Sequence, residues 1–212
     1  MNQLKRVQML EMLQEVYQGA RIELNYETEF QLLIAVLLSA QATDIGVNKA
    51  TKGLFSEVSD PQQMIDFGEK DLKNAIKSIG LYHTKAKNVM KLSHILQEEY
   101  QGLVPRTRVG LEALPGVGRK TANVVLNELF GHATIAVDTH IFRVCNRSGL
   151  AKGETPLKVE LCLLKVVPEA YKKDLHQWLI QLGRYTCVAR KPKCSQCPIA
   201  ELCEFPDKVY EA

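Results

Sequence analysis

Four cysteines gather near the end of the chain with a spacing suited to a metal centre. Six cysteines occur in all, and four of them follow the pattern Cys187-x6-Cys194-x2-Cys197-x5-Cys203. Four thiolates in so short a segment can close around one centre. The spacing leaves three interpretations open: an iron–sulfur cluster, a structural zinc ion, or thiols unrelated to any metal. Zinc sites usually pair two short C-x2–4-C knuckles, and only Cys194 and Cys197 form one here.

Basic side chains accompany these cysteines. They are Arg184, Arg190, Lys191 and Lys193, opposed within the cysteine segment only by Glu201. A loop held rigid by a metal and bearing these charges suits contact with a phosphate backbone. The alternative is a solvated basic loop without a ligand.

A glycine-containing turn is the densest signal in the sequence. It is the string Leu114-Pro115-Gly116-Val117-Gly118-Arg119-Lys120-Thr121-Ala122. Gly116 and Gly118 permit positive φ and close backbone approach, and the N–H groups at the start of the next helix can bind a phosphate oxygen. A lone G-x-G is weak evidence, but the whole string matches a helix-hairpin-helix motif. This motif binds the DNA backbone without reading sequence, and Arg119 lies beside its glycines.

Two side chains near this turn have types suited to covalent chemistry. Lys120 falls in the first turn of the second helix, where the positive helix end disfavours a charged ammonium and favours a nucleophilic amine. Asp138 follows in Val137-Asp138-Thr139-His140. Each has an ordinary alternative, because Lys120 could be another phosphate contact and Asp138 could be a helix N-cap.

The elements that must position these residues are helices. Capping and periodicity predict helices over 30–38, from Asp60-Pro61, from Leu72 to a stop at Gly80, from about Lys85, over 107–114, over 119–130, from Asp138 through Val144, from Thr155-Pro156, and from Asp174 to Gly183. Only residues 134–137 look β-like. We therefore expect an all-α fold of many short helices, with Cys145 and Cys162 at core positions outside the cysteine cluster.

Composition excludes several classes of protein. The 212 residues are 46% hydrophobic and 24% charged, which argues against intrinsic disorder. The formal net charge of +3 permits a polyanionic partner without requiring one. The longest apolar run, 32–38, is too short to cross a membrane, and the first residues do not form a signal peptide. We expect an intracellular protein, in the bacterial cytoplasm and associated with the nucleoid.

These residues together resemble the endonuclease III family of DNA glycosylases. The resemblance spans essentially the whole chain and rests on Ser39–Asp44, on the hairpin with Lys120, on Val137–His140 and on the cysteine spacing. It implies a [4Fe–4S] cluster on Cys187, Cys194, Cys197 and Cys203. It also implies two α-helical domains flanking a DNA-binding cleft. A six-helix barrel with the hairpin would span 22–132, and a cluster domain would join 1–21 to 133–212.

The family resemblance further implies a reaction. The substrate would be double-stranded DNA with oxidised or ring-saturated pyrimidines or abasic sites, bound by a monomer, and the base would be flipped from the stack. Lys120 would attack C1′, Asp138 would assist, and β-elimination would cut the strand 3′ to the lesion. Gln41 would fill the hole left by the base and Leu81 would wedge the opposite strand. The ordinary alternatives are a helix-end amide for Gln41 and a core leucine for Leu81.

Three other functions are weighed against this one. The adenine-specific mismatch glycosylase resembles the hairpin and cluster but lacks the lysine at position 120 and has a further C-terminal domain, for which we expect no counterpart here. A non-catalytic DNA-binding module would leave Lys120 and Asp138 without a role. An iron–sulfur electron carrier would leave the hairpin without one.

Overall fold

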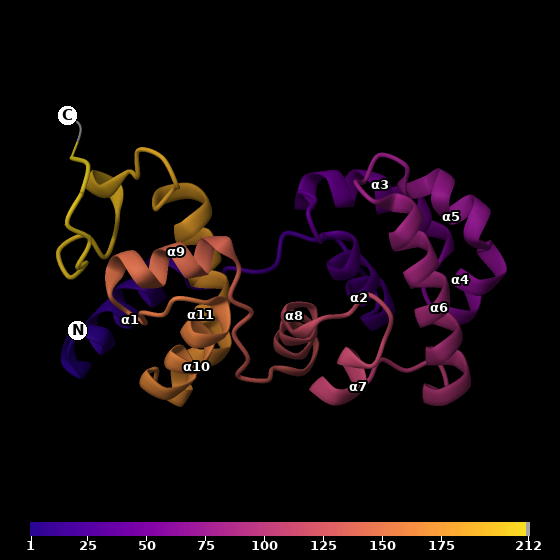
Figure 1. The fold of residues 1–212 in the computed structure, drawn as a ribbon, viewed down its shortest axis with the longest axis horizontal. Coiled ribbons are helices and arrows are strands. Elements are labelled where there is room, and N and C mark those ends of the chain that lie inside the picture. Colours follow the sequence, from indigo (N-terminus) through magenta and orange to yellow (C-terminus); the bar gives the residue numbers. More distant parts are fainter. Residues whose placement is uncertain (211–212) are drawn as a thin grey trace. The chain divides into compact units, whose positions relative to one another are not determined.

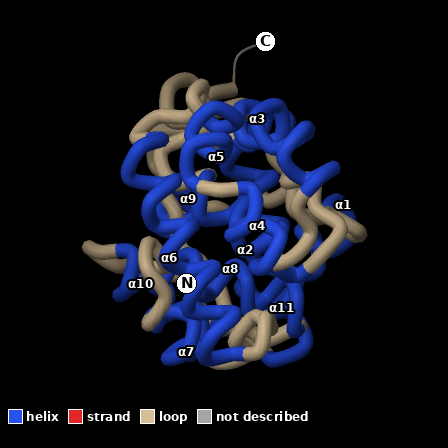
Figure 2. Tube along the Cα trace, turned by 90° about the vertical axis from the view of Figure 1, so that its right-hand side faces the viewer, coloured by secondary structure: helices blue, strands red, loops and turns tan. Residues whose placement is uncertain are grey.

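The computed structural model describes residues 1–210, and these form helices and loops without a strand (Figure 1, Figure 2). The all-α prediction is therefore confirmed. The chain divides into two compact units: one is Glu23–Phe130, and the other combines Met1–Ile22 with the chain from Gly131 onward. None of the helices in the described residues is long and apolar enough to span a membrane.

The unit Glu23–Phe130 is built around a helix that is buried on all sides. Its helices are α2 (Glu29–Leu38), α3 (Asp44–Glu57), α4 (Pro61–Phe67), α5 (Glu69–Ile76), α6 (Tyr82–Tyr100), α7 (Arg108–Glu112) and α8 (Arg119–Phe130). Every residue of α2 after Glu29 is buried, and the helix packs against α3, α6 and α8. The five-residue α7 forms the first arm of the hairpin.

Side-chain caps explain where several of these helices begin. The hydroxyl of Thr28 accepts a hydrogen bond from the Gln31 N–H, and Asp60 accepts one from the Gln63 N–H, with Pro61 in the first turn. The Gln31 side chain is itself buried and donates through Nε2 to the carbonyls of Phe55 and Val58. It thereby ties α2 to the connection between α3 and α4.

The second unit is discontinuous in sequence. It contains α1 (Gln3–Tyr17), α9 (Thr139–Ser148), α10 (Pro156–Val166), α11 (Glu169–Gln181), a π-turn (Leu182–Thr186) and a 3-10 turn (Cys194–Gln196). Met9, Leu10 and Leu13 of α1 belong to the same hydrophobic core as Leu175 and Leu179 of α11. The start of the chain is therefore part of the core of this unit.

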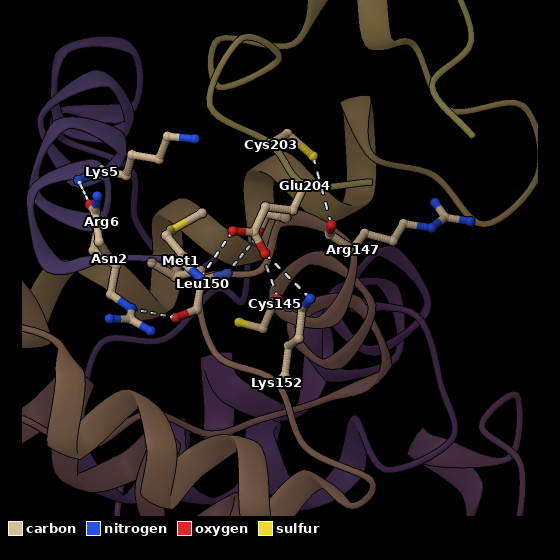
Figure 3. Close-up of polar contacts among 11 residues, drawn as sticks. Met1, Asn2, Lys5, Arg6, Cys145, Arg147, Leu150, Lys152, Cys203 and Glu204 are labelled. Carbon is tan, nitrogen blue, oxygen red and sulfur yellow. Dashed lines mark hydrogen bonds and ion pairs between the residues drawn. The ribbon is translucent and has the colours of Figure 1, made fainter. Parts of the chain in front are cut away.

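Polar contacts also join the start of α1 to the residues after α9 (Figure 3). Arg6 Nε donates to the Leu150 carbonyl at 3.1 Å. The Glu204 carboxylate lies 3.0 Å from the Met1 amino group and 3.3 Å from Lys152 Nζ. Cys203 Sγ lies 3.9 Å from the Arg147 carbonyl. The segment that contains Cys203 is thus attached to both α1 and α9.

Some predicted helix limits are wrong. The helix expected from Asp174 to Gly183 begins at Glu169, after Pro168, which fixes φ at the helix start. Gly183 does not end it, since the chain continues into the π-turn. The helix expected to close at Gly80 ends at Ile76, and the one expected from about Lys85 begins at Tyr82.

The segment 134–137, predicted to be β-like, is also not a strand. All four of its side chains are buried in the second unit, between Gly131 and the start of α9. Apolar, β-branched residues here serve core packing in a connecting segment, which a short apolar run cannot distinguish from a strand.

Candidate active site and metal centre

The hairpin joins α7 to α8 around two buried apolar residues. Leu114 and Val117 are buried, whereas Gly116 and Gly118 are exposed. Gly116 has φ of 81°, and a Cβ there would lie 2.9 Å from Asn88 Nδ2 of α6. Only glycine meets both conditions without strain. The Gly118 carbonyl accepts from the Ala122 N–H and so begins α8, whose first N–H groups have no acceptor within the helix.

Lys120 is the second residue of α8, immediately after this turn. Its side chain is exposed and has no hydrogen-bond or ion-pair partner within the unit 23–130. Arg119 beside it is half-buried and holds a polar contact of its own. The structure therefore presents an unpaired amine at the start of a helix, next to the exposed glycines of the hairpin.

Asp138 lies in the second unit and caps α9. Its Oδ1 accepts from the N–H groups of His140 and Ile141, both at 2.8 Å. The side chain is half-buried, and Oδ2 has no hydrogen-bond partner within its unit. The N-cap interpretation is thus correct, and it leaves one carboxylate oxygen available.

Gln41 and Leu81 share an unusual backbone conformation. Their φ angles are 55° and 59°, in the left-handed region that non-glycine residues rarely adopt. Both side chains are exposed, with Leu81 at 63% relative accessibility. The alternative of Leu81 as a core leucine is therefore wrong. Such strained positions concentrate at functional sites.

All four clustered cysteines line one cavity. The cavity is lined by Cys187, Cys194, Cys197 and Cys203 together with Arg147, Thr186, Pro192, Lys193, Ala200, Phe205 and Lys208. Among residues 1–210, no three His, Cys, Asp or Glu side chains gather closely enough to hold a single metal ion. Four thiols that line one cavity are a donor set suited to an iron–sulfur cluster, and the cationic side chains of Arg147, Lys193 and Lys208 offset the charge of four thiolates.

Burial in this cavity changes the acidity of the thiols. It raises the pKa of Cys197 to about 11 and also raises the pKa of Cys203. Without a metal both groups are neutral thiols at neutral pH, so binding a metal centre must displace their protons.

Two arginines of α9 hold the segment before and after Cys187. Arg143 donates through Nε to the Cys187 carbonyl at 2.8 Å and through Nη2 to the Gly183 carbonyl at 2.7 Å. Arg147 donates to the carbonyls of Val188 and Ala189, and its Nη1 lies 3.7 Å from Cys187 Sγ. The sequence patterns predict neither residue. Their spacing of four on one helix was the available signal.

The basic residues around the cysteines differ in their exposure and in their contacts. Arg190, Lys191 and Lys193 are exposed, and Lys191 has φ of 51°. Lys193 also lines the cysteine cavity. Arg184 differs from them because it lies in the π-turn, half-buried and with a polar contact.

Residues 34–169 match the HhH-GPD superfamily base excision DNA repair protein family, and residues 187–203 match the iron–sulfur binding domain of endonuclease III. The chain belongs to the endonuclease III family. Endonuclease III of Haemophilus influenzae is 57% identical and that of Escherichia coli strain K12 is 56% identical, each over 99% of both chains.

Two solved structures of DNA-acting proteins have the same fold as this chain. A trapped endonuclease III–DNA covalent intermediate superposes with a TM-score of 0.89 at 43% identity, covering 96% of each chain. A thermostable thymine-DNA glycosylase gives a TM-score of 0.86 at 25% identity, covering 97% of this chain and 98% of that one.

Family membership settles three questions that the sequence left open. The chain is a DNA glycosylase and abasic-site lyase of base excision repair, as predicted. Its cofactor is a [4Fe–4S] cluster, so the zinc and unrelated-thiol interpretations are wrong. The non-catalytic module and the electron carrier are excluded as descriptions of the whole chain.

Proposed function

We propose that this endonuclease III family member removes oxidised or ring-saturated pyrimidines from duplex DNA and then cleaves the strand 3′ to the abasic site. The supporting observation is Lys120, an exposed amine without a partner in its unit, directly after the hairpin. A relative 43% identical to this chain was trapped as a covalent intermediate with DNA. An amine nucleophile accounts for both steps in one site.

In the proposed reaction Lys120 Nζ attacks C1′ of the flipped nucleotide. The C1′–N bond breaks, its electron pair leaves with the base, and the base takes up a proton. The nitrogen then loses a proton and the sugar ring opens to give a Schiff base. Removal of a C2′ proton breaks the bond from C3′ to the phosphate oxygen, which is β-elimination. Water finally hydrolyses the imine and frees the lysine.

Asp138 assists this reaction through its carboxylate. We assign it to activating the Lys120 amine or stabilising the positive charge that develops on the sugar. The arrangement at α9 supports this role, since Oδ1 takes both capping hydrogen bonds and Oδ2 has none within its unit.

DNA is held by elements that read no sequence. The exposed hairpin turn at Gly116 and Gly118, with Arg119, would bind backbone phosphates through main-chain N–H groups and charge. Arg184, Arg190, Lys191 and Lys193 would add a second phosphate contact. Gln41 would fill the space left by the flipped base and Leu81 would separate the opposite strand.

The cluster would be held by Cys187, Cys194, Cys197 and Cys203. We assign it a structural role, because neither base release nor β-elimination transfers electrons. When bound, it supplies four iron–thiolate bonds that fix the loop between Cys187 and Cys203.

Borohydride trapping on duplex DNA with an abasic site tests the proposed function. Borohydride reduces a Schiff base to a stable amine, so the unaltered chain should become covalently attached to DNA. Lys120→Gln should abolish both attachment and strand cleavage while DNA binding persists. Lys70→Gln is a matched control, since Lys70 is also an exposed second residue of a helix. Full activity of Lys120→Gln would refute the proposed nucleophile.

A further inference from the structure

Among residues 1–210 one lysine is buried, and the proposed reaction assigns it no role. Lys85 of α6 is only 6% accessible, and burial lowers the pKa of its ammonium. Its Nζ donates to the carbonyl of Leu38 at 2.9 Å and to that of Ala40 at 2.7 Å. Burying a charged group costs free energy unless the group is hydrogen-bonded, and these two hydrogen bonds compensate the Lys85 ammonium for the lost water.

The two acceptors lie at the loop that contains Gln41. Leu38 is the last residue of α2, where carbonyl groups lack helical partners and the helix end is negative. The Ala40 carbonyl belongs to the peptide group that immediately precedes Gln41. Lys85 therefore holds both the start of this loop and the peptide plane on which the left-handed conformation of Gln41 depends.

The backbone of the same residue is attached to the turn that contains Leu81. The Lys85 N–H donates to the Leu81 carbonyl at 3.0 Å and closes the first turn of α6. Leu81 caps this helix with no side-chain hydrogen bond. Lys85 thus contacts Ala40, the residue before Gln41, through its side chain and Leu81 through its main chain.

The adjacent turn of α6 extends this arrangement to the hairpin. Asn88 follows Lys85 by three residues, and its side chain packs beneath Gly116, leaving no room for a Cβ there. Residues three and four apart lie on one face of a helix. One face of α6 therefore supports the Gln41 loop, the Leu81 turn and the hairpin.

We propose that Lys85 is a positioning residue that keeps the exposed Gln41 and Leu81 side chains in fixed register for insertion into duplex DNA opened at a flipped nucleotide. This inference rests on the proposed function, because it assigns Lys85 a role through the two residues that occupy the opened stack. Lys85 itself is too buried to contact DNA.

The experiment compares duplex DNA, in which the base stack must be opened, with single-stranded DNA, which has no stack to open. Lys85→Met removes the ammonium and keeps the length of the side chain. On duplex DNA with a ring-saturated pyrimidine, single-turnover base excision should fall by at least about tenfold, since small misplacements at a reaction site have effects of this size. Borohydride trapping on single-stranded abasic DNA, which has no stack to open, should match the unaltered chain. Lys85→Arg should restore part of the duplex rate.

Gln31→Met is the matched control for stability. Gln31 is also buried in this unit and also donates two hydrogen bonds to main-chain carbonyls, those of Phe55 in the last turn of α3 and of Val58 directly after that helix. The loop between α3 and α4 has no proposed DNA contact. Gln31→Met should lower thermal stability without a defect specific to duplex DNA. If Lys85→Met does not fold, Lys85→Gln replaces it under the same comparison.

A double-mutant cycle tests whether Lys85 acts through its neighbours. In a background of Gln41→Ala and Leu81→Ala, Lys85→Met should add little further loss on duplex DNA. Fully additive losses, or equal losses on duplex and single-stranded DNA, would overturn the proposal. If the unaltered chain itself cannot be trapped on duplex abasic DNA, the proposed function fails instead, so the two failures are distinguishable.

Discussion

Asp138 illustrates how one side chain can have a structural and a chemical role. Its Oδ1 accepts two main-chain hydrogen bonds at the start of α9, and its Oδ2 has no partner within the unit. Aspartate and asparagine are nearly equivalent as N-caps, whereas only aspartate has a negative charge. The two roles can therefore be separated by a single substitution.

We predict that Asp138→Asn slows base excision by at least about 100-fold, the usual contribution of a positioned acid–base group. The amide oxygen can still accept the capping hydrogen bonds, so stability should change by no more than about 0.5 kcal/mol. Single-turnover excision and thermal unfolding measure these effects. Asp60→Asn is the control, because Asp60 also caps a helix, α4, by accepting a hydrogen bond from a first-turn N–H. An unchanged excision rate in Asp138→Asn would leave Asp138 as a cap only.

Residue types predicted the parts of the site that have distinctive chemistry. Lys120 and the four cysteines were selected from the sequence because their types and spacing are rare by chance. Lys85, Arg143 and Arg147 were not, since each donates mainly to main-chain carbonyls. Any residue has such a carbonyl, so the sequence does not identify the partner. These contacts depend on the fold bringing α2, α6, α9 and the cysteine segment into place.

Among the elements, the cysteine segment has the least regular structure to hold it. Between Cys187 and Cys203 the only helical piece is the 3-10 turn Cys194–Gln196. The segment is instead attached to α9 by Arg143 and Arg147. The Arg147 guanidinium also lies 4.7 Å from the centre of the ring of Phe205, two residues after Cys203. Its order must therefore depend strongly on the bound cluster.

We predict that Cys197→Ser yields protein with fewer irons and lower thermal stability, and that it loses the yellow-brown colour. The unaltered chain should contain about four irons and absorb broadly at roughly 400 nm. Cys162→Ser is the control, because Cys162 lies on α10 and does not line the cavity. Iron analysis, absorbance and thermal unfolding measure the difference. Stoichiometric zinc in a colourless, active preparation would contradict this prediction.

The exposed charges of this segment predict a uniform effect on DNA binding. Arg190→Glu or Lys193→Glu should weaken binding to damaged and undamaged duplex alike, and should reduce the salt dependence of log K by about one unit per lost phosphate contact. Fluorescence anisotropy over a range of salt concentrations measures both. Lys165→Glu on α10 is the charge-matched control, since Lys165 is exposed and has no assigned DNA contact. A loss confined to damaged DNA would mean that the segment recognises the lesion.

The helices also show which local sequence signals are sufficient to predict where a helix begins. Those with a side-chain cap followed by apolar periodicity, such as α2, α4 and α10, were predicted at or near their observed starts. The start of α11 was misplaced because Pro168 occupies its N-cap position without a side-chain hydrogen bond. Its end was misplaced because Gly183 packs against His140, where a Cβ would lie 2.8 Å away, and does not serve as a stop. The tertiary contact with His140, and not a helix stop, is the reason for glycine at position 183.

At the scale of the whole molecule, the two units differ in how the chain builds them. Glu23–Phe130 is continuous in sequence and has its own buried core around α2. The other unit needs α1, because Met9, Leu10 and Leu13 are fully buried in the same core as residues of α9, α10 and α11. Its core is complete only when the two ends of the chain come together.

We therefore predict that residues 23–130 fold when expressed alone, whereas residues 131–212 do not. A continuous segment of about 100 residues with its own core is a typical autonomous domain. Circular dichroism should show a helical spectrum and cooperative unfolding for 23–130, and little helix for 131–212 until α1 is restored. The isolated 23–130 segment should bind duplex DNA weakly, with strong salt dependence, through the hairpin. It should not excise bases, because it lacks Asp138. An unfolded 23–130 segment would mean that its core depends on the other unit, and measurable excision by it would remove Asp138 from the proposed mechanism.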